Sequence, residues 1–441
     1  MFGRRRFLEG TAGIGVTLTV GAATSGCGSS GGGASANEWV VGSYLSLTGE
    51  QSKFGEDTKR GIELAIEEIN ANPPKGKKIK VLFEDNKSKV EEATQKVQQL
   101  IDRDKVVAVL GEIASSISKP AAIICNQKKV PMITPSSTHP DVTKTGEYAF
   151  RVCFTDDFQG KAGADFCVKS LGKKKVGIMY AENDLYSQGL AAEFKKAVGP
   201  AGGEVVIEKK FTDTETNFTT YIKEVKDAGV EVIYCPIYYN QMTPLWRQAK
   251  AEGLTGDMFV GGDGWSGDDT LLKELEGGFF TDHYAPDVPW AAGKKFVEAF
   301  KKKFNQAPSS LAACGYDAAM VLADAIKRAK EDTPKGIRDA IAETKEYAGA
   351  TGSITINKDR NADKAIVFVQ IKGGTTAYKA AVGPGAEKLT EGAPPPTPET
   401  AKPDDSAAPA ASGSAAPDAS AAAAGSASAA PAASASAAPK P

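Results

Sequence analysis

Two loops in the first half of this chain carry side chains suited to binding an anion. Ser115 opens a predicted helix after one apolar run, and Ser136 and Thr138 follow the next apolar run. Hydroxyl groups and free backbone N–H groups at a helix start bind a carboxylate or similar anion without any net positive charge. Ser115 could equally cap its helix without a ligand. The occurrence of both loops together favours a site.

The second half of the chain carries side chains suited to binding a cation, which complement the anion-binding loops of the first half. Asp263 and Trp265 lie in the segment Gly261-Gly262-Asp263-Gly264-Trp265, and Tyr186 and Tyr238 each follow an apolar run. A carboxylate supplies charge for an ammonium group, and an aromatic face adds cation–π attraction and packing. An Asp between glycines is usually a turn residue, so this alternative stays open for Asp263.

Enzyme motifs are mostly missing. The sequence contains neither the dinucleotide-binding glycine fingerprint nor a P-loop. Ser116-Ile-Ser-Lys119 and Lys144-Thr-Gly146 match two short patterns of penicillin-recognising enzymes, but no Ser-Asp-Asn follows them. Chance accounts for these matches better than catalysis does, and His139 fits a loop position better than the role of a base. An exported hydrolase of this kind is the alternative from another functional class.

Alternating strands and helices must position these loops. Residues 62, 65, 66 and 69 are apolar at helical spacing, which predicts a helix with one buried stripe. Alternation of this kind predicts parallel strands with crossover helices on both faces, and ligands bind beyond the carboxyl ends of such strands. The first predicted series has strands at 39–45, 78–84, 106–111 and 131–135 and further helices at 90–104 and 116–127.

A second series of the same kind follows and predicts a second α/β half. Its expected strands are 148–154, 175–181, 204–211, 231–236, 258–261 and 278–283, with helices that include 158–171, 218–228 and 242–252. Three helices then follow at 291–304, 309–330 and 336–343. Strand-like runs at 352–356 and 365–372 flank a predicted turn at 357–361.

Residues 1–26 are typical of an export signal. Arginines precede Phe7-Leu8 in the manner of the twin-arginine type, and a weakly apolar stretch follows. The segment ends Thr24-Ser25-Gly26-Cys27, which is similar to a bacterial lipobox in which Cys27 is lipidated, although Thr24 replaces the usual Leu. Ordinary cleavage beside an incidental cysteine is the alternative. Residues 10–26 are too short and too rich in Gly for a permanent membrane span.

Composition separates the folding part of the chain from its ends. Residues 27–36 form a Gly/Ser linker, and residues 386–441 consist mainly of Ala, Pro, Ser and Gly, a composition that predicts a disordered tail. About 350 residues are left, which is more than one hydrophobic core usually serves, so two domains are expected. The formal net charge of −2 gives no basic field for nucleic acid.

The cysteines predict neither a metal site nor a disulfide framework. Five cysteines follow Cys27, no CxxC occurs, and the whole chain has two His. We therefore expect no metal and no cofactor. Cys125 lies among apolar residues on a predicted helix and is expected in the core, whereas a bridge between Cys153 and Cys167 stays open.

From residue 39 to 372 the chain resembles the type I periplasmic binding proteins of branched-chain amino acid transporters. Several stretches carry this resemblance through their order and spacing. They are Ser46-Leu-Thr-Gly-Glu-Gln-Ser-Lys-Phe-Gly55, Ala65-Ile66-Glu67-Glu68-Ile69-Asn70, Leu110-Gly-Glu, Ser115-Ser116, Pro131-Met-Ile-Thr-Pro-Ser136, Tyr186-Ser-Gln-Gly, Arg247-Gln-Ala and Gly253-Leu254.

The resemblance implies two doubly wound parallel-sheet lobes, joined by a three-segment hinge, that close on a ligand in the cleft. Lobe 1 would comprise residues 37–155 and 286–350, and lobe 2 residues 156–285 and 351–385. By position, Ser115, Ser136 and Thr138 would hold an α-carboxylate. Tyr186, Tyr238 and Asp263 would hold the α-ammonium and cover the site, and Phe54 would line its side-chain end.

Some residues depart from the family pattern and leave the ligand open. Asp263 stands where leucine-type binders carry Glu, and Ser136-Ser137 stands where Ala is common. Family members also bind amides, urea and aromatic acids.

The resulting interpretation is a non-enzymatic, monomeric, lipid-anchored receptor outside the cytoplasm. It would deliver an amino acid or similar ligand to the permease of an ABC importer. A ligand sensor for a signalling partner is the alternative within the same fold.

Overall fold

The structure, a computed structural model, describes residues 37–384 and residue 386. The predicted export signal, Cys27, the linker at 27–36 and the tail from residue 387 onward lie outside the described residues. Within the described part, no helix combines the length and apolar character that a membrane crossing requires.

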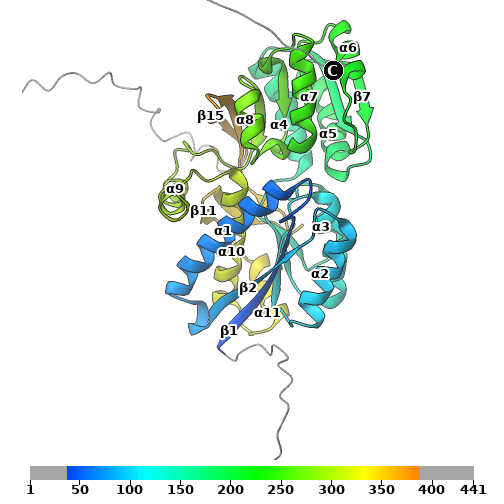
Figure 1. Ribbon diagram of the computed structural model, residues 1–441. Coiled ribbons are helices and arrows are strands. Elements are labelled where there is room, and N and C mark those ends of the chain that lie inside the picture. Colours follow the sequence, from blue (N-terminus) through cyan, green and yellow to red (C-terminus); the bar gives the residue numbers. More distant parts are fainter. Residues whose placement is uncertain (1–36, 385, 387–441) are drawn as a thin grey trace, which may run out of the picture. The chain divides into compact units, whose positions relative to one another are not determined.

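A five-stranded parallel sheet is built from the first part of the chain (Figure 1). Its strand order is β2-β1-β3-β4-β5. The predicted strand series counted the run at 148–154 with the second half, whereas the lobe boundary implied by the resemblance placed it in lobe 1; β5 pairs with β4 in this first sheet. A short 3-10 turn at Pro140–Thr145 connects β4 to β5, where a crossover helix connects most of the other parallel strands. The sequence pattern relied on such helices to group the strands, so it gave no sign that β5 continues the first sheet. The strands are β1 (Glu38–Leu45), β2 (Lys78–Asp85), β3 (Ala108–Leu110), β4 (Met132–Thr134) and β5 (Ala149–Arg151).

The helices on this sheet come from two distant parts of the sequence. They are α1 (Ser52–Ala71), α2 (Val90–Asp102), α3 (Ser115–Lys128), α10 (Ser310–Arg328) and α11 (Pro334–Ala342). In α1 the predicted stripe is confirmed, since Ile62, Ala65 and Ile69 are buried. Helices α1 and α10 pack side by side, and a Cβ on Gly61 would lie 1.9 Å from the Ala312 carbonyl oxygen. Only glycine permits this close approach.

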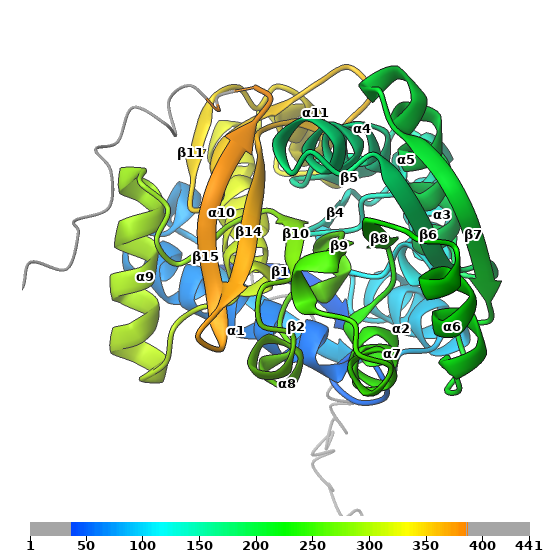
Figure 2. The same ribbon diagram turned by 90° about the horizontal axis from the view of Figure 1, so that it is seen from above.

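The second sheet has seven strands in the order β15-β14-β10-β9-β8-β6-β7 (Figure 2). Strands β6 to β10 run parallel to their neighbours in this group, whereas β14 pairs antiparallel with both β10 and β15. The strands are β6 (Lys175–Ala181), β7 (Glu204–Phe211), β8 (Val232–Cys235), β9 (Phe259–Gly261), β10 (Phe279–Asp282), β14 (Ile366–Lys372) and β15 (Thr375–Val382).

The two runs that flank the predicted turn at 357–361 belong to different sheets. Strand β12 (Gly352–Ile356) pairs with β11 (Tyr347–Gly349) and β13 (Ala362–Asp363), whereas β14 joins the second sheet. The sequence analysis did not predict β15. Most side chains of β15 are half-buried or exposed, so no apolar alternation marks it.

Helices of the second half cover the second sheet. They are α4 (Asp156–Asp165), α5 (Leu185–Ala201), α6 (Thr219–Asp227), α7 (Tyr239–Ala251) and α8 (Asp269–Glu274). A π-helical turn at Phe166–Ser170 continues α4, and α7 begins three residues before the predicted start. Helix α9 (Ala291–Phe304) then leads to α10 and packs against α1.

Within the described residues, the chain passes between the two sheets after β5, after β10 and between β13 and β14. The α/β class with two parallel-rich sheets is confirmed. At the third crossing, buried Lys364 donates to the Thr351 hydroxyl at 2.5 Å. Asp317 of α10 accepts from the same hydroxyl and from the backbone N–H groups of Ala350 and Thr351. Buried polar groups therefore fix this crossing.

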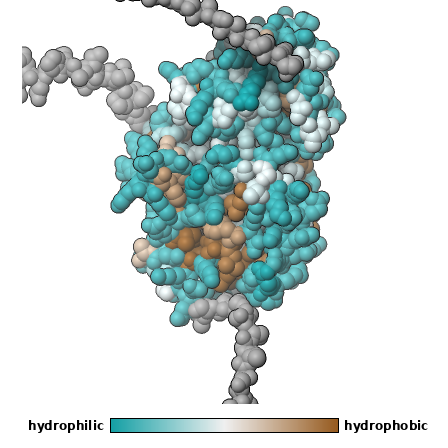
Figure 3. Space-filling view, in the orientation of Figure 1, coloured by the Kyte–Doolittle hydropathy of each residue, from teal (hydrophilic) through white to brown (hydrophobic). Residues whose placement is uncertain are grey.

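The state of the cysteines and the character of the surface can be described for the same residues. The five cysteines of the described part are buried and free, so the bridge between Cys153 and Cys167 is absent, and Cys125 lies in the core as predicted. The face seen in Figure 3 is mostly polar, with one apolar area in its lower half. A shallow groove lined by Ile66, Val81 and Phe83 lies between α1 and the edge strand β2.

Candidate functional site

Loops at the carboxyl ends of the first sheet's strands form one wall of the candidate site. Ser115 is the first residue of α3, Ser136 and Thr138 follow β4, and Phe54 lies in the first turn of α1. All four side chains are buried. The sequence predicted each of these positions, and the structure brings all four to one region.

The opposite wall comes from the second sheet. Tyr186 lies in the first turn of α5, Tyr238 directly precedes α7, and Asp263 opens the 3-10 turn η5 (Asp263–Trp265) after β9. These side chains are also buried. Glycine at 262 is required here, because a Cβ at that position would lie 2.3 Å from the Tyr186 hydroxyl.

The two walls contact each other directly. The Ser136 hydroxyl lies 3.4 Å from Asp263 Oδ2, and the Ser115 backbone N–H donates to the Tyr238 hydroxyl at 3.4 Å. The Ser115 side-chain oxygen accepts from the backbone N–H of His139 at 3.2 Å. The backbone N–H of Ser115, expected from the sequence to be a free donor at the start of α3, therefore binds a tyrosine hydroxyl from the opposite wall.

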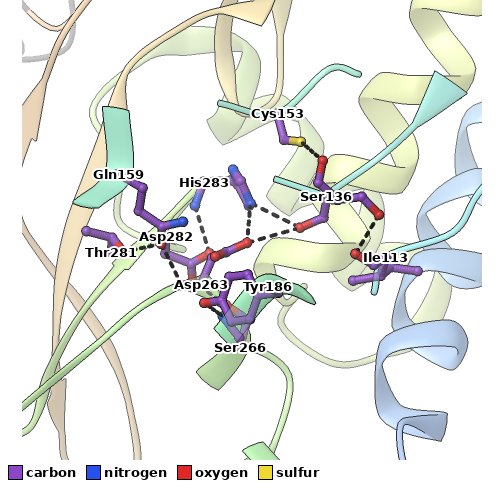
Figure 4. Close-up of polar contacts among 12 residues, drawn as sticks. Ile113, Ser136, Cys153, Gln159, Tyr186, Asp263, Ser266, Thr281, Asp282 and His283 are labelled. Carbon is purple, nitrogen blue, oxygen red and sulfur yellow. Dashed lines mark hydrogen bonds and ion pairs between the residues drawn. The ribbon is translucent and has the colours of Figure 1, made fainter. Parts of the chain in front are cut away.

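His283 joins Asp263 and Ser136 in a buried polar group (Figure 4). His283 Nε2 lies 3.1 Å from both Asp263 Oδ2 and the Ser136 hydroxyl. Burial lowers the pKa of His283, although Asp263 opposes that effect, so the ring is neutral at pH 7 and its Nε2–H can donate to the carboxylate. Phe154 stacks on the imidazole at 4.1 Å between ring centroids. This packing fixes the imidazole beside Asp263.

Several acceptor atoms in this region lack a partner among the described residues. Asp263 Oδ1 is one, and Asp156 Oδ2 is another. Burial raises the pKa of Asp156 well above its usual range, and the neighbouring charge of Asp263 adds to the effect. Because two adjacent buried carboxylates resist ionising together, the protonated form of Asp156 is favoured. The arrangement offers a buried carboxylate oxygen of Asp263 without a partner among the described residues, which suits an ammonium group or another cation.

Aromatic rings cover the polar group. Tyr186 and Tyr238 stack with their centroids 4.8 Å apart, and Phe54 meets Tyr238 edge-on at 5.4 Å. Tyr239 packs against Phe54 at 4.9 Å, and its hydroxyl donates to the Glu50 carbonyl at 3.0 Å. Rings from both halves therefore exclude water, and in such a setting electrostatic contacts are strong.

Buried residues behind the first wall hold its loops in place. Glu112 accepts from the hydroxyl and the backbone N–H of Ser46, and from the backbone N–H groups of Ile113 and Ala114. Arg151 of β5 donates to the carbonyl of Ser137 at 2.5 Å and to that of His139 at 2.7 Å. These contacts orient the segments that carry Ser115, Ser136 and Thr138.

Gln159 of α4 has the same role on the second wall. Its Oε1 accepts from the Asp263 backbone N–H at 3.1 Å and from the Thr281 hydroxyl at 2.6 Å. Sequence reasoning missed Gln159, Glu112, Arg151 and His283. His283 and Glu112 had a usable signal, because His283 ends a predicted strand and Glu112 directly follows one, at the edge where ligand-facing residues gather. The roles of Gln159 and Arg151 depend on contacts with loops distant in the sequence.

Trp265 was expected to offer an aromatic face beside Asp263, but it is fully buried. Its Nε1 donates to the Cys235 carbonyl and its ring packs against Gly261 and Phe280, because glycine at 261 leaves room for the indole. Lys119 of the Ser-x-x-Lys match pairs with Asp141 at 3.0 Å.

His139 accepts from the Asp141 backbone N–H, as the loop interpretation predicts. Among the described residues, no group of His, Cys, Asp and Glu could hold a metal ion.

Comparison with known proteins identifies relatives over most of the described chain. A family model for periplasmic binding protein matches residues 38–376. A leucine-, isoleucine-, valine-, threonine- and alanine-binding protein of Pseudomonas aeruginosa is 30% identical over 308 residues, which cover 67% of this chain and 79% of that protein.

Solved structures agree with this match. The substrate-binding protein of a branched-chain amino acid transporter from Streptococcus pneumoniae, in complex with isoleucine, has a TM-score of 0.73 and 30% identity, covering 79% of this chain and 100% of that chain. A solute-binding protein of an ABC transporter from Rhodopseudomonas palustris, in complex with 3,4-dihydroxybenzoic acid, has a TM-score of 0.71 and 25% identity, covering 80% and 99%.

Proposed function

We propose that this chain, which belongs to the periplasmic binding protein family, captures an amino acid or an amino-acid-like molecule for an ABC importer. Like its relatives, it is a binding protein and not an enzyme. The observation that carries the ligand class is the buried Asp263 carboxylate. It lies opposite hydroxyl-bearing loops and beneath aromatic rings from both halves.

In this proposal the two charges of an α-amino acid are separated between the walls. The ammonium group contacts Asp263, whose Oδ1 has no other partner among the described residues, and Tyr186 and Tyr238 cover it. The carboxylate contacts Ser115, Ser136 and Thr138 at the start of α3 and after β4. Phe54 then borders the rest of the ligand.

An aromatic acid is the competing ligand. One relative of known structure was solved with 3,4-dihydroxybenzoic acid, and such a ligand has a carboxylate but no ammonium group. The charged Asp263 favours the amino acid, because a buried carboxylate without a cationic partner is costly. A sensor that docks on a signalling protein would use the same site, so the proposal of an importer rests on the relatives.

The ligand class can be tested by screening. Purified residues 37–386 should gain several degrees in Tm with at least one α-amino acid, and calorimetry should then give a dissociation constant below about 10 μM. Amides and aromatic acids serve as comparison ligands in the same screen. Stabilisation by aromatic acids alone would contradict the amino-acid proposal and leave the family assignment intact.

We also propose that the chain is held at the cell envelope by lipid on Cys27, the residue after the predicted export signal. Lipidation at that position requires its thiol, so Cys27→Ser should convert a membrane-associated protein into a soluble exported one. Fractionation of cells that express both forms measures this. Membrane association of the Cys27→Ser protein would show a different anchor.

A further inference from the structure

A polar cavity of about 370 Å³ lies beside the candidate site. Four buried polar side chains line it. Asp57 and Ser310 come from α1 and α10, which cover the first sheet, whereas Ser266 and Asp282 come from segments that adjoin the second sheet. The cavity therefore lies where the two halves of the molecule meet.

The elements that carry the candidate site also carry this cavity. In α1, Asp57 lies one helical turn after Phe54, and Ser266 follows the turn that begins at Asp263. Asp282 directly precedes His283, and Figure 4 shows Ser266 and Asp282 next to Asp263. On each of these elements, a residue that lines the cavity therefore lies within one to three positions of a residue of the candidate site.

The buried polar groups of the cavity wall are mainly hydrogen-bond acceptors, and Leu272 and Phe280 also belong to the lining. Asp282 Oδ2 accepts from the Ser266 hydroxyl at 2.9 Å, and Asp282 Oδ1 accepts from the His283 backbone N–H at 2.7 Å. The Ser310 hydroxyl lies near the Asp282 carboxyl but has no hydrogen-bond partner among the described residues. Asp57, at 7% exposure, adds a second buried carboxylate.

Positive charge lies at the rim of the cavity. Arg60 donates to Asp57 Oδ1 at 2.9 Å, and Lys53 approaches Glu56 at 3.9 Å. Each of these two cationic side chains is about a third exposed. The buried polar lining of the cavity therefore presents oxygen atoms, and the cations lie toward its exposed side.

We infer that this cavity receives the part of the ligand beyond its α-carbon, and that this part carries N–H or O–H donors. The inference rests on the proposed function. An aliphatic side chain here would face the Asp57 and Asp282 carboxyls and would leave the Ser310 hydroxyl without a partner. Sites built to hydrogen-bond a polar group reject an apolar analogue strongly, because their own polar groups are then left unpaired.

Calorimetry with leucine, asparagine and ornithine tests the inference. Leucine and asparagine have the same branched shape, so they differ in donors and not in size, whereas ornithine adds a cationic donor. Asparagine or ornithine should bind at least tenfold more tightly than leucine. A smaller preference, or tighter binding of leucine, overturns the inference and leaves the proposed function standing. If no α-amino acid binds, both fail.

Two variants test whether the cavity is responsible for the preference. Ser310→Ala and Asp57→Asn should each weaken the preferred polar ligand about 3- to 10-fold and leave leucine affinity unchanged. Asp102→Asn is the control, because Asp102 is exposed on α2 and pairs only with Lys128 at the surface. Circular dichroism confirms that each variant is folded. A preference that survives both substitutions overturns the assignment to this cavity.

Discussion

Replacing Asp263 by alanine tests the proposed site most directly. Asp263 is buried, and one of its carboxylate oxygens contacts His283 and Ser136 while the other has no partner among the described residues. Burial raises the pKa of the neighbouring Asp156 and disfavours its charged form, so Asp263 is the proposed counter-charge at this end of the site. Its loss should remove the counter-charge of the ligand's ammonium group.

The size of the effect follows from burial. Removing one partner of a buried, hydrogen-bonded charge pair costs about 2–5 kcal/mol, since the other charge is left unpaired. At about 1.4 kcal/mol per tenfold change, Asp263→Ala should weaken an amino-acid ligand roughly 30-fold or more. Alanine also removes the acceptor of His283 and Ser136, so the free energy of unfolding should change as well.

A second substitution separates charge from hydrogen bonding. Asp263→Asn keeps an oxygen that can accept from His283 Nε2 but removes the negative charge. We expect it to lose most of the affinity while its Tm stays closer to that of the parent than the Tm of Asp263→Ala does. Asp257→Ala is a suitable control, because Asp257 is an exposed acid in the nearby turn Gly256–Met258.

Isothermal titration calorimetry with the tightest amino acid from the screen gives the affinities. If Asp263→Ala binds that ligand as the parent does, Asp263 does not hold an ammonium group. The amino-acid proposal then fails, whereas membership of the family is unaffected.

Three further substitutions probe other parts of the molecule. Ser115→Ala removes one hydrogen bond to a charged group, so it should weaken binding by about 1.5–3 kcal/mol, less than the loss of the Asp263 carboxylate; an equal or larger loss in calorimetry would contradict this ranking. Asp317→Ala leaves three buried donors without their acceptor and should lower the free energy of unfolding by about 3 kcal/mol, measured by urea denaturation, whereas Asp324→Ala, at a half-buried residue that pairs with Arg328, should change it by less than about 1 kcal/mol. Burial raises the pKa of Asp282 to about 7, so the stability that its protonated form provides is present at low pH and is lost as pH rises toward 7. Asp282→Asn should therefore gain about 1–2 kcal/mol relative to the parent between pH 5 and pH 8, and parallel stability profiles of the two proteins would refute this reasoning.

The sequence predicted the elements that bury a regular apolar pattern. The stripe of α1 and the buried strand β6 follow local periodicity, so their positions could be derived from the residues alone. Strand β15 has no such pattern, and its place depends on pairing with β14. The strand series misplaced β5 because a 3-10 turn, and not a helix, connects it to β4, although the lobe boundary at residue 155 included it in the first half.

The same distinction applies to the candidate site. Ser136 and Asp263 could be predicted because each follows a strand at its carboxyl end, where parallel sheets place their loops. The contact of both residues with His283 depends on how the two sheets pack against each other. No local sequence pattern predicts that packing. The packing of Trp265 against Gly261 is likewise a property of the folded core.

The packing of α1 against α10 also bears on how this chain folds. The Tyr316 hydroxyl of α10 donates to the Glu68 carboxylate of α1, a contact between residues 248 positions apart. During synthesis the apolar stripe of α1 stays without this cover until the chain beyond residue 328 has emerged, because α10 ends there. Folding dominated by such distant contacts is slow and exposes apolar surface for longer. A chaperone that binds the nascent first half would therefore act on this molecule before its second sheet is complete.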